Sequence, residues 1–507
     1  MNKNFYLTTP LYYVNAEPHI GSAYTTIICD AICRFQKFYG NEVYFLTGID
    51  EHGGKIENTA KQKNLEAQIH CDLMSDKFQE LWTDLNINYN VFSRTSSEHH
   101  KKFVETFFKK VFDNGDIYEG EYKGLYCLAC EDFKNERELI DGNLCPIHKT
   151  KVQEYSEKNY FFKLSKYTEE IKQFLKNNPD FIQPQYRMSE IENWISEGLR
   201  DFPISRRSVN WGVKVPNDPS QTIYVWFDAL LGYLSPLVKN PESLDELKDF
   251  EGYYHIVGKD ILKFHAVYWI AMLMSAGVVL PQKIFGHGFL TKDGQKMGKT
   301  TGNTIDPYEL NKKFGTDAVR FYFCFNIPFG ADGDYSENVF IELVNAYLAN
   351  RLGNLFSRVL KLFETYLNLE IPNIKLSKNS QIAQMSLNLP EKVKQAMFNL
   401  EPHNALKEIF TVIDSLNLIF TERKPWTLLK SEDNNEKEKA IILLVEIMES
   451  LRIINNLLMP FMPNLTEKIS KIFNTPPLGR WGAQKTWGYL KQGQKLNNTG
   501  IVFSRLE

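Results

Sequence analysis

The sequence has little cysteine, no excess of charge of one sign and no hydrophobic run suited to a membrane. Its 507 residues include seven cysteines, and the formal net charge is -3 with 24% of residues charged. So few cysteines in a long chain do not indicate the disulfide framework of a small secreted protein. The balanced charge excludes a basic coat for nucleic acid, so an RNA partner would have to be held by local patches.

Two segments that could direct a chain to a membrane do not have the features required. The N-terminal stretch MNKNFYLTTPLYYV carries little positive charge, is interrupted by Pro10 and has no small-residue cleavage site, unlike a signal peptide. The longest uncharged run, residues 264–282, is broken by Gly277 and Pro281, and its helical part is too short to span a bilayer. We expect a buried core helix there, no membrane association and a cytoplasmic protein.

Alternating apolar strands and helices predict an α/β fold with a parallel sheet. The alternation runs over residues 1–115, is lost over residues 116–223, where Cys, Gly and charged residues gather, and resumes over residues 224–338. Amphipathic helices dominate residues 339–507, and one apolar stripe there consists of Leu444, Met448, Leu451, Asn455 and Leu458. The predicted architecture is a Rossmann-type sheet domain split by an insertion and followed by an all-α bundle.

A single histidine, His19, stands where the first strand gives way to a helix that we expect to end at Gly40, in the stretch PHIGSAY. A ligand at this helix N-terminus would meet free backbone N–H groups and the positive end of the helix dipole, which favour phosphate. Gly21 would let the backbone approach that ligand, and Pro18 would stiffen the entry. The alternative is a histidine satisfied by local hydrogen bonds.

A second candidate for phosphate binding is the loop TKDGQKMGKTTGN, which follows the last strand of the predicted sheet. Lys296 and Lys299 lie three residues apart amid Gly294, Gly298 and Gly302. A mobile segment of this kind could bring two cations onto a polyphosphate. The alternative is a solvated hairpin tip, but two such segments in the two halves of a split sheet are more specific than either alone.

The insertion contains two closely spaced pairs of metal-binding side chains, in CLACEDFKNERELIDGNLCPIH. Cys127 and Cys130 form one pair, and Cys145 and His148 form the other. Three thiolates and one imidazole are a ligand set of structural zinc that leaves no position for water. The alternatives are four unrelated residues, or a catalytic zinc beside Glu131. The remaining cysteines are expected to be buried thiols: Cys29, Cys33, Cys71 and Cys324.

The stretches HIGS and KMGKT together resemble the paired hallmarks of class I aminoacyl-tRNA synthetases, written HIGH and KMSKS. Among these enzymes the chain is similar to the methionine-specific members through TTPLYYVNAEPHIGSAYTT, TGIDEHGGKI, VWFDALLGY, GKDILKFH and GHGFLTKDGQKMGKTTGN, which spread over most of its length. Ser22 stands in place of the second histidine, and Gly298 and Thr300 replace the two serines. Ser22 can donate one neutral hydrogen bond to a phosphate oxygen but carries no charge.

The resemblance implies a methionine–tRNA ligase that works in two steps. The carboxylate of L-methionine would attack the α-phosphorus of ATP, which Mg²⁺ accompanies, to give methionyl-adenylate and pyrophosphate. The methionyl group would then pass to the terminal adenosine of tRNA(Met), initiator tRNA included. The implied catalytic residues act as hydrogen-bond donors and cations toward phosphate rather than as acids or bases. They are His19, Ser22, Lys296 and Lys299.

The resemblance also implies where the two small substrates bind. Asp260 would accept from the ribose hydroxyls, although an N-cap role is the alternative, and the ATP site would contain His19, Gly21, Ser22, Gly258, Asp260, His287 and Lys299. Asp50 would hold the methionine ammonium, and aromatic walls would contact the thioether, with core packing as the alternative for the aromatics. The methionine site would consist of Leu11, Tyr13, Asp50, Trp226, Ala229, Tyr233, Phe264 and His265.

For the tRNA, the resemblance implies two separate contacts. The zinc knuckle would help to guide the acceptor end, and Asn354, Arg358 and Trp426 would read the CAU anticodon by stacking and hydrogen bonding. The alternative for Trp426 is a core anchor. No OB-type domain follows the bundle, so we expect a monomer. Two competing functions remain open: another small class I aminoacyl-tRNA synthetase, and a tRNA-binding paralogue with impaired catalysis.

Overall fold

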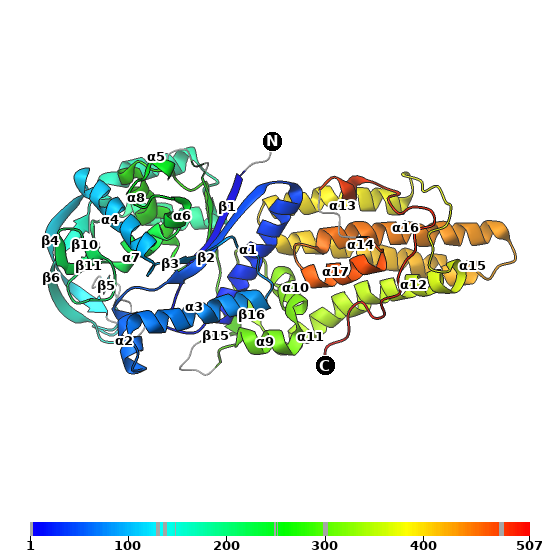
Figure 1. Ribbon diagram of the computed structural model, residues 1–507, viewed down its shortest axis with the longest axis horizontal. Helices are drawn as coiled ribbons and strands as arrows, with labels where there is room; N and C mark the ends of the chain where they lie inside the picture. Colours follow the sequence, from blue (N-terminus) through cyan, green and yellow to red (C-terminus); the bar gives the residue numbers. More distant parts are fainter. Residues whose placement is uncertain are drawn as a thin grey trace.

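The computed structural model is elongated, with a sheet-containing part at one end and a helical bundle at the other (Figure 1). It describes residues 4–127, 132–134, 139–147, 149–247, 250, 252–297, 303–475 and 481–507. Within these residues no helix is both long and apolar enough to cross a membrane.

A six-stranded, all-parallel sheet forms the centre of the first part. Its two halves, which are far apart in sequence, meet where Leu7 of β1 pairs with Tyr254 of β12. In spatial order the strands are β3 (Val91–Arg94), β2 (Glu42–Asp50), β1 (Asn4–Tyr13), β12 (Tyr254–Gly258), β13 (Lys283–His287) and β7 (Ile182–Gln183). The predicted parallel, Rossmann-type sheet is therefore confirmed.

The predicted insertion, residues 116–223, contains smaller antiparallel sheets but is not wholly separate from the central one. Strand β7 lies within it and pairs Ile182 with Ile284 of β13, which makes it an edge of the central sheet. The other strands are β4 (Ile117–Cys127), β5 (Asp132–Lys134), β6 (Gln153–Phe162), β8 (Phe202–Pro203), β9 (Ser205–Arg206), β10 (Lys214–Val215) and β11 (Asp218–Ile223). The α-helices that the structure describes there are α5 (Thr168–Asn177) and α6 (Tyr186–Ser196).

Side chains alternate across the central sheet, as the two-residue period of a strand requires. Leu7 and Phe45 pack on one face, in a core that continues into the bundle, whereas Tyr6 and Leu46 pack on the other face with the insertion. The helices of this part are α1 (Ile20–Tyr39), α2 (Gly54–Gln62), α3 (Ala67–Asp84), α4 (Glu98–Asp113), α7 (Val225–Leu231), α8 (Trp269–Ala276), α9 (Pro307–Phe314) and α10 (Thr316–Asn326).

Helix α1 and the apolar run 264–282 form as the sequence predicts. Gly40 ends α1 with a φ of 109°, and its N–H donates to the carbonyl groups of two preceding residues. The apolar run is a π-helical turn, Phe264–Tyr268, followed by α8, which is almost entirely buried and ends at Gly277 with a φ of 69°. The four cysteines expected to be buried thiols are buried: Cys29, Cys33, Cys71 and Cys324.

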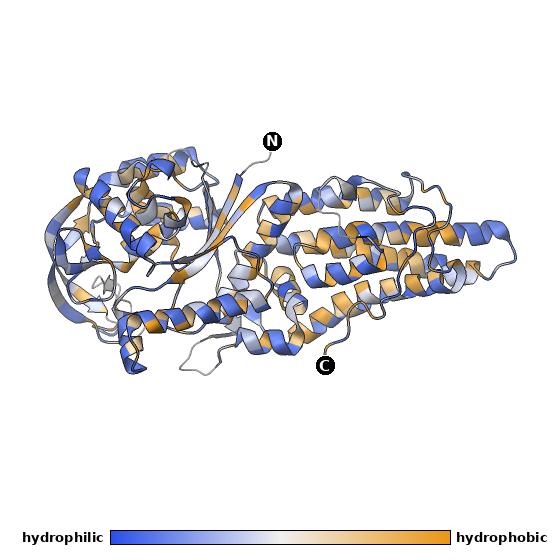
Figure 2. Ribbon diagram, in the orientation of Figure 1, coloured by the Kyte–Doolittle hydropathy of each residue, from blue (hydrophilic) through white to orange (hydrophobic). Residues whose placement is uncertain are grey.

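The bundle packs its helices around α16 (Asn434–Leu458), so the prediction of a single apolar stripe on this helix is too narrow. Every residue from Leu443 to Leu458 is buried, and the central position of the helix is visible in Figure 2. Among its buried polar residues, Glu449 accepts hydrogen bonds from Arg452 and from the Tyr489 amide.

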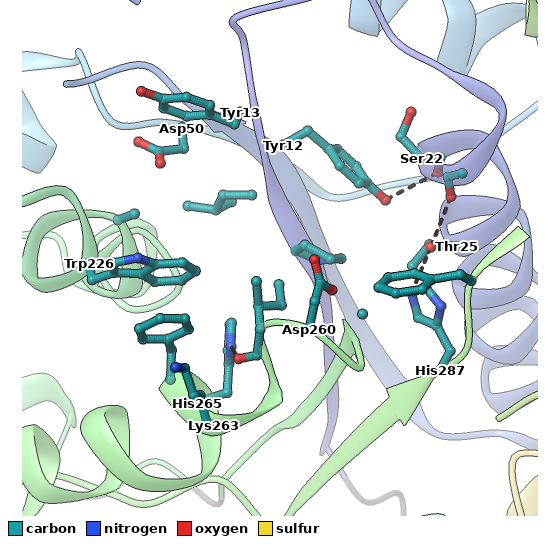
Figure 3. Close-up of a pocket in the computed structure, with 18 of the residues that line it drawn as sticks. Tyr12, Tyr13, Ser22, Thr25, Asp50, Trp226, Asp260, Lys263, His265 and His287 are labelled. Atoms are coloured by element: carbon teal, nitrogen blue, oxygen red, sulfur yellow. Dashed lines mark hydrogen bonds between the residues drawn. The ribbon is translucent and has the colours of Figure 1, made fainter. Parts of the chain in front are cut away.

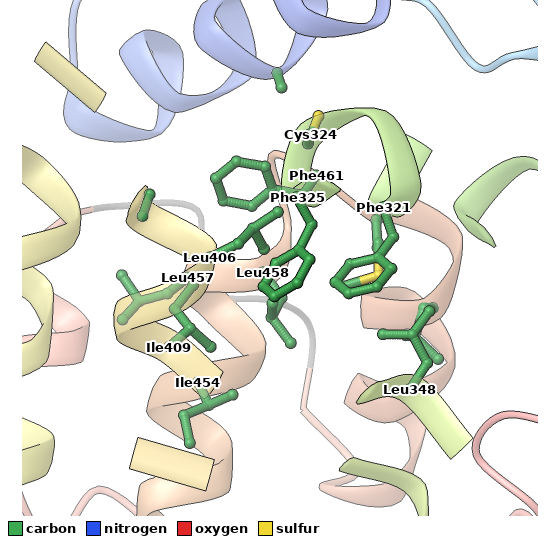
Figure 4. Close-up of a cluster of buried hydrophobic side chains, with 14 of the residues drawn as sticks. Phe321, Cys324, Phe325, Leu348, Leu406, Ile409, Ile454, Leu457, Leu458 and Phe461 are labelled. Carbon is green, nitrogen blue, oxygen red and sulfur yellow. The ribbon is translucent and has the colours of Figure 1, made fainter. Parts of the chain in front are cut away.

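The bundle joins the sheet part through a continuous apolar interface rather than a flexible link. Phe321 and Phe325 of α10 pack on Phe410 of α14 (Pro402–Arg423), with ring centroids 5.5 and 5.9 Å apart. Figure 4 shows both rings in one buried cluster with Leu406 of α14 and Leu458 of α16. The remaining helices of the bundle are α11 (Glu337–Val344), the π-helical segment Asn345–Gly353, α12 (Asn354–Leu367), α13 (Gln381–Phe398), α14 (Pro402–Arg423), α15 (Pro425–Leu428) and α17 (Pro463–Ile472).

Candidate active site

A cleft of about 650 Å³ opens at the carboxyl ends of four central strands. The last residue of each strand lines it: Tyr13 of β1, Asp50 of β2, Gly258 of β12 and His287 of β13. Figure 3 shows Tyr13, Asp50 and His287 around one cavity. The structure thus brings together fourteen of the predicted residues: Leu11, Tyr13, His19, Gly21, Ser22, Asp50, Trp226, Ala229, Tyr233, Gly258, Asp260, Phe264, His265 and His287.

His19 caps α1 with its own ring, so the first amides of the helix are not free as predicted. Its Nδ1 accepts hydrogen bonds from the amides of Gly21, at 3.1 Å, and Ser22, at 3.4 Å. A neutral ring that accepts at Nδ1 carries its proton on Nε2, which makes Nε2 a donor. A Cβ atom on Gly21 would lie 3.0 Å from the ring, so glycine leaves room for this cap.

Ser22 completes the cap rather than pointing a hydroxyl proton at the cleft. Its Oγ donates to the His19 carbonyl at 2.7 Å and accepts from the His19 amide at 3.1 Å, which is the reciprocal pattern of a capping box. A serine hydroxyl has one proton, and that proton is directed to the His19 carbonyl. The predicted direct donation from Ser22 to phosphate is therefore not made in this conformation.

At the β12 and β13 side of the cleft, hydrogen bonds fix the state of His287. Its Nδ1 donates to the Gly288 carbonyl at 2.8 Å, so its Nε2 accepts from Thr25 Oγ1 at 2.9 Å. Burial lowers the pKa of His287 to about 4, which keeps the ring neutral. Next to it, a Cβ atom on Gly258 would lie 2.6 Å from a carboxylate oxygen of Asp260, so the glycine makes space for that carboxylate.

On the opposite side of the cleft the walls are aromatic. The rings of Trp226 and Phe264 stack with centroids 3.8 Å apart. His265 Nδ1 donates to the Ile261 carbonyl at 3.0 Å, so its Nε2 accepts the Tyr233 hydroxyl proton at 2.9 Å. Burial lowers the pKa of His265 to about 4. The His265 ring and the Tyr233 hydroxyl, which are neutral and hydrogen-bonded to each other, are therefore the polar groups of an otherwise apolar wall.

Comparisons with known proteins agree with this geometry. A family profile described as "tRNA synthetases class I (M)" matches residues 5–155 and 138–360. The Methionine--tRNA ligase of Nostoc sp. is 46% identical over 100% of this chain and 98% of its own length. The chloroplastic/mitochondrial Methionine--tRNA ligase of Arabidopsis thaliana is also 46% identical, over 100% of this chain and 83% of its own. The Mycobacterium tuberculosis methionyl-tRNA synthetase, solved with methionyl-adenylate, superposes with a TM-score of 0.94 at 37% identity, covering 99% of this chain and 100% of that one.

The chain belongs to the methionyl-tRNA synthetase family of class I tRNA synthetases.

The lysine loop of this synthetase begins with an ordered hairpin. Strands β14 (Leu290–Lys292) and β15 (Gln295–Lys296) pair Thr291 with Lys296, and β14 also pairs with β16 (Gly333–Tyr335). The hairpin starts at Leu290, a cleft residue three positions after His287. Lys299, with Gly298 and Thr300, lies outside the described residues.

Half of the predicted zinc set can be located in the synthetase. Cys127 and Cys145 are both buried and belong to one small cluster with Val152. Cys130 and His148 lie outside the described residues, and within those residues no three metal-binding side chains converge.

The three predicted anticodon residues lie in the helical part. Asn354 and Arg358 are one turn apart on the exposed face of α12. The Arg358 guanidinium lies over the rings of Phe420, at 4.5 Å, and Trp426, at 5.6 Å. Trp426 is half-buried and packs on the bundle core, as the alternative of a core anchor predicts.

Sequence reasoning missed several residues that line the cleft. Thr25 follows Gly21 by one helical turn and contacts His287, so helix periodicity could have located it. The Tyr12 hydroxyl contacts the Ser22 carbonyl and the Thr26 hydroxyl, and its position near the end of β1 could have located it. Lys55 stands five residues after Asp50, on α2. Lys134 and Ile147 reach the cleft from the insertion, and no local pattern signals that they do so.

The two neutral histidines of the cleft predict acid sensitivity. Each has a folded pKa of about 4 against an ordinary value of 6.5, so the unfolded chain binds more protons between these values. The free energy of unfolding should fall as the pH falls from 6.5 toward 4, by up to about 3 kcal/mol for each ring. Urea unfolding of the parent chain at pH 7 and at pH 4.5 measures the fall.

His287→Gln should reduce this fall because the amide does not titrate. The control is His99→Gln at an exposed position, which should leave the fall unchanged. Equal pH dependence in the parent chain and the His287 variant would contradict a buried neutral imidazole.

Proposed function

We propose that the cleft binds ATP and L-methionine and forms methionyl-adenylate, which the enzyme then uses to charge tRNA(Met), initiator tRNA included. The observation that carries this proposal is one cavity where β1 and β12 meet, lined by fourteen residues implied for the two small substrates. The full-length likeness to Methionine--tRNA ligases supports the same activity and argues against another amino-acid specificity.

The proposed mechanism is positioning together with electrostatic stabilisation. During attack of the methionine carboxylate on the α-phosphorus, negative charge increases on the phosphate oxygens. His19 is a suitable donor because its Nδ1 is occupied by the helix amides, which leaves the proton on Nε2. Lys296 and Lys299 would add positive charge, and Mg²⁺ would accompany ATP. Asp260 and His287 would bind the nucleoside, with Ser22 and Gly21 supporting the His19 ring.

Methionine selection would combine one charge with a fitted apolar wall. The Asp50 carboxylate would accept the ammonium, whereas the Trp226 and Phe264 rings would contact the thioether, whose sulfur interacts favourably with aromatic rings. Leu11, Tyr13 and Ala229 would form the rest of this wall. Tyr233 and His265, bonded to each other, add a polar spot without net charge. A β-branched side chain would fit such a narrow space poorly.

We further propose one structural zinc held by Cys127, Cys130, Cys145 and His148. The donor chemistry fits, because three thiolates and an imidazole close a tetrahedral site. Supporting this, Cys127 and Cys145 are buried in one cluster beside Thr150, to whose carbonyl the Cys145 amide donates at 2.9 Å. The knuckle would fix the insertion segment whose Ile147 lines the cleft, where the acceptor end of tRNA must arrive.

The domain assignment follows from these roles. Residues 1–115 and 224–338 would form the catalytic domain, residues 116–223 the connective insertion, and residues 339–507 the anticodon-binding domain, with Asn354, Arg358 and Trp426 as base-reading residues. We propose a monomer that works in the cytoplasm.

Amino-acid-dependent exchange of pyrophosphate into ATP tests the activity. Methionine should support exchange and cysteine or branched aliphatic amino acids should not. Lys299→Ala should slow adenylate formation by orders of magnitude with little change in methionine affinity, because it removes charge needed only as the phosphate reacts. A chain that binds tRNA but exchanges no pyrophosphate would be the impaired paralogue instead.

Trp426→Ala separates the tRNA step from adenylate formation. It should reduce charging of tRNA(Met) by about 10- to 100-fold, since stacking of one base contributes about 1–3 kcal/mol, while methionine-dependent exchange stays at the parent rate. Phe398→Ala, at an exposed position elsewhere on the bundle, is a matched control. Equal loss in both assays would indicate misfolding and not a lost base contact.

Elemental analysis of the purified chain checks the zinc proposal. About one zinc per chain is expected, and Cys145→Ser should release it because a tetrahedral site of this kind needs all four ligands. Cys33→Ser, which changes a buried thiol of α1, should keep the metal. An active chain without metal would contradict the proposal.

A further inference from the structure

The segment that follows Asp50 is held from several sides by the protein. Strand β2 ends at Asp50, which lines the cleft beside Tyr13 and opposite Trp226 (Figure 3). The next residue, Glu51, is fully buried and faces away from the cleft. Its carboxylate accepts from Arg94 Nη2 at 2.6 Å and from the Ser96 amide at 3.0 Å. Of two adjacent carboxylates, one is thus neutralised by arginine and the other is directed to the cleft.

His52 anchors the same segment to a different part of the protein. Its Nδ1 donates to Asp228 Oδ2 at 2.6 Å, and the second oxygen of Asp228 accepts from His100 Nε2 at 2.8 Å. Both histidines and Asp228 are almost completely buried. Burial opposes ionisation of Asp228, but the charge interaction with His52 and the hydrogen bonds from both rings hold the pKa of Asp228 below its usual range.

The geometry relates this anchor to the methionine side of the cleft. The His52 amide donates to Asp50 Oδ1 at 3.5 Å, so the peptide that His52 fixes is in direct contact with the Asp50 carboxylate. Asp228 lies on α7 between Trp226 and Ala229, two cleft residues. A third contact holds the segment after Asp50 in place: the Gly53 amide donates to the Trp211 carbonyl at 3.1 Å.

We propose that His52 is a positioning residue for methionine: tied to Asp228, it holds the Asp50 carboxylate where the ammonium of the amino acid binds. This inference rests on the proposed function of the cleft. The His52 ring donates through Nδ1, and its buried Nε2 has no hydrogen-bond partner among the residues that the structure describes. We therefore expect only the Nδ1 donor, which reaches Asp228, to be required. Another side chain that places a donor at the position of Nδ1 should substitute for the histidine.

Two amides of similar chemistry test this requirement. In His52→Asn the amide nitrogen takes the place of Nδ1, whereas in His52→Gln it takes the place of Nε2 and cannot reach Asp228 without displacing the segment. Isothermal titration calorimetry would measure binding of L-methionine and of 4-(methylthio)butanoate, which is methionine without its ammonium. ATP binding is measured alongside.

His52→Gln should weaken methionine binding about 10- to 100-fold, the range expected for losing a buried hydrogen bond to a charged group. Binding of 4-(methylthio)butanoate and of ATP should change less than about twofold, because neither ligand has an ammonium for Asp50. His52→Asn should bind methionine within a fewfold of the parent chain. In an Asp50→Asn background, His52→Gln should add no further loss, since the two changes act through one carboxylate.

The control is His99→Gln, on the same helix as His100 but exposed, which should bind both ligands as the parent chain does. If His52→Gln does not fold, Asp228→Asn should give the same selective loss, because it removes the charge that His52 meets. Equal weakening of both ligands, or equal behaviour of the Asn and Gln variants, would overturn the positioning role. A parent chain that binds methionine yet exchanges no pyrophosphate would overturn only the proposed function.

Discussion

The pairing of β1 with β12 is the constraint on which the site depends. On one side of this pair the sheet continues through β2 and β3, and on the other side through β13 and β7, so the direction of winding reverses there. At such a reversal the loops that leave the two central strands turn to opposite faces and leave a crevice at their carboxyl ends. Tyr13 and Gly258 end these two strands and both line the cleft. The insertion lies outside this pair of strands and is tied to the sheet through β7, which pairs with β13 at its edge.

Groups around the crevice have fixed protonation states because neighbouring protein atoms occupy one side of each. His19 accepts from two amides, His287 donates to a carbonyl, and His265 lies between a carbonyl and a tyrosine hydroxyl. His19 therefore presents its Nε2 donor at neutral pH, whereas His287 and His265 use both ring nitrogens to hold neighbouring protein groups in place. Polar groups held in this way need little reorganisation as charge develops on a phosphate, which is the basis of electrostatic catalysis.

The sequence predicts the parts of this arrangement that depend on local pattern. Strand and helix periodicity with Gly40 locates α1, and the motif around His19 marks its start. The sequence leaves local hydrogen bonding of the His19 ring as one of two alternatives, because the same residues would also fit a helix end with free amides. The contact of His52 with Asp228 joins residues 176 positions apart. No short motif records such a pair, and only the packing of α7 against the end of β2 brings them together.

Helix α1 connects the crevice with the bundle. For this reason the packed core continues across the domain boundary predicted near residue 339. The first turn of α1 carries His19, and its middle carries Asp30, which is fully buried and bonded to the equally buried Arg320 at 2.5 Å. Arg320 also donates to the carbonyl groups of Pro460 and Phe461, at the corner between α16 and α17. Removing one partner of such a buried pair costs about 3–5 kcal/mol, because the other charge is left without compensation. The direction of α1, and with it the place of the His19 ring, is therefore set by the bundle as much as by the sheet.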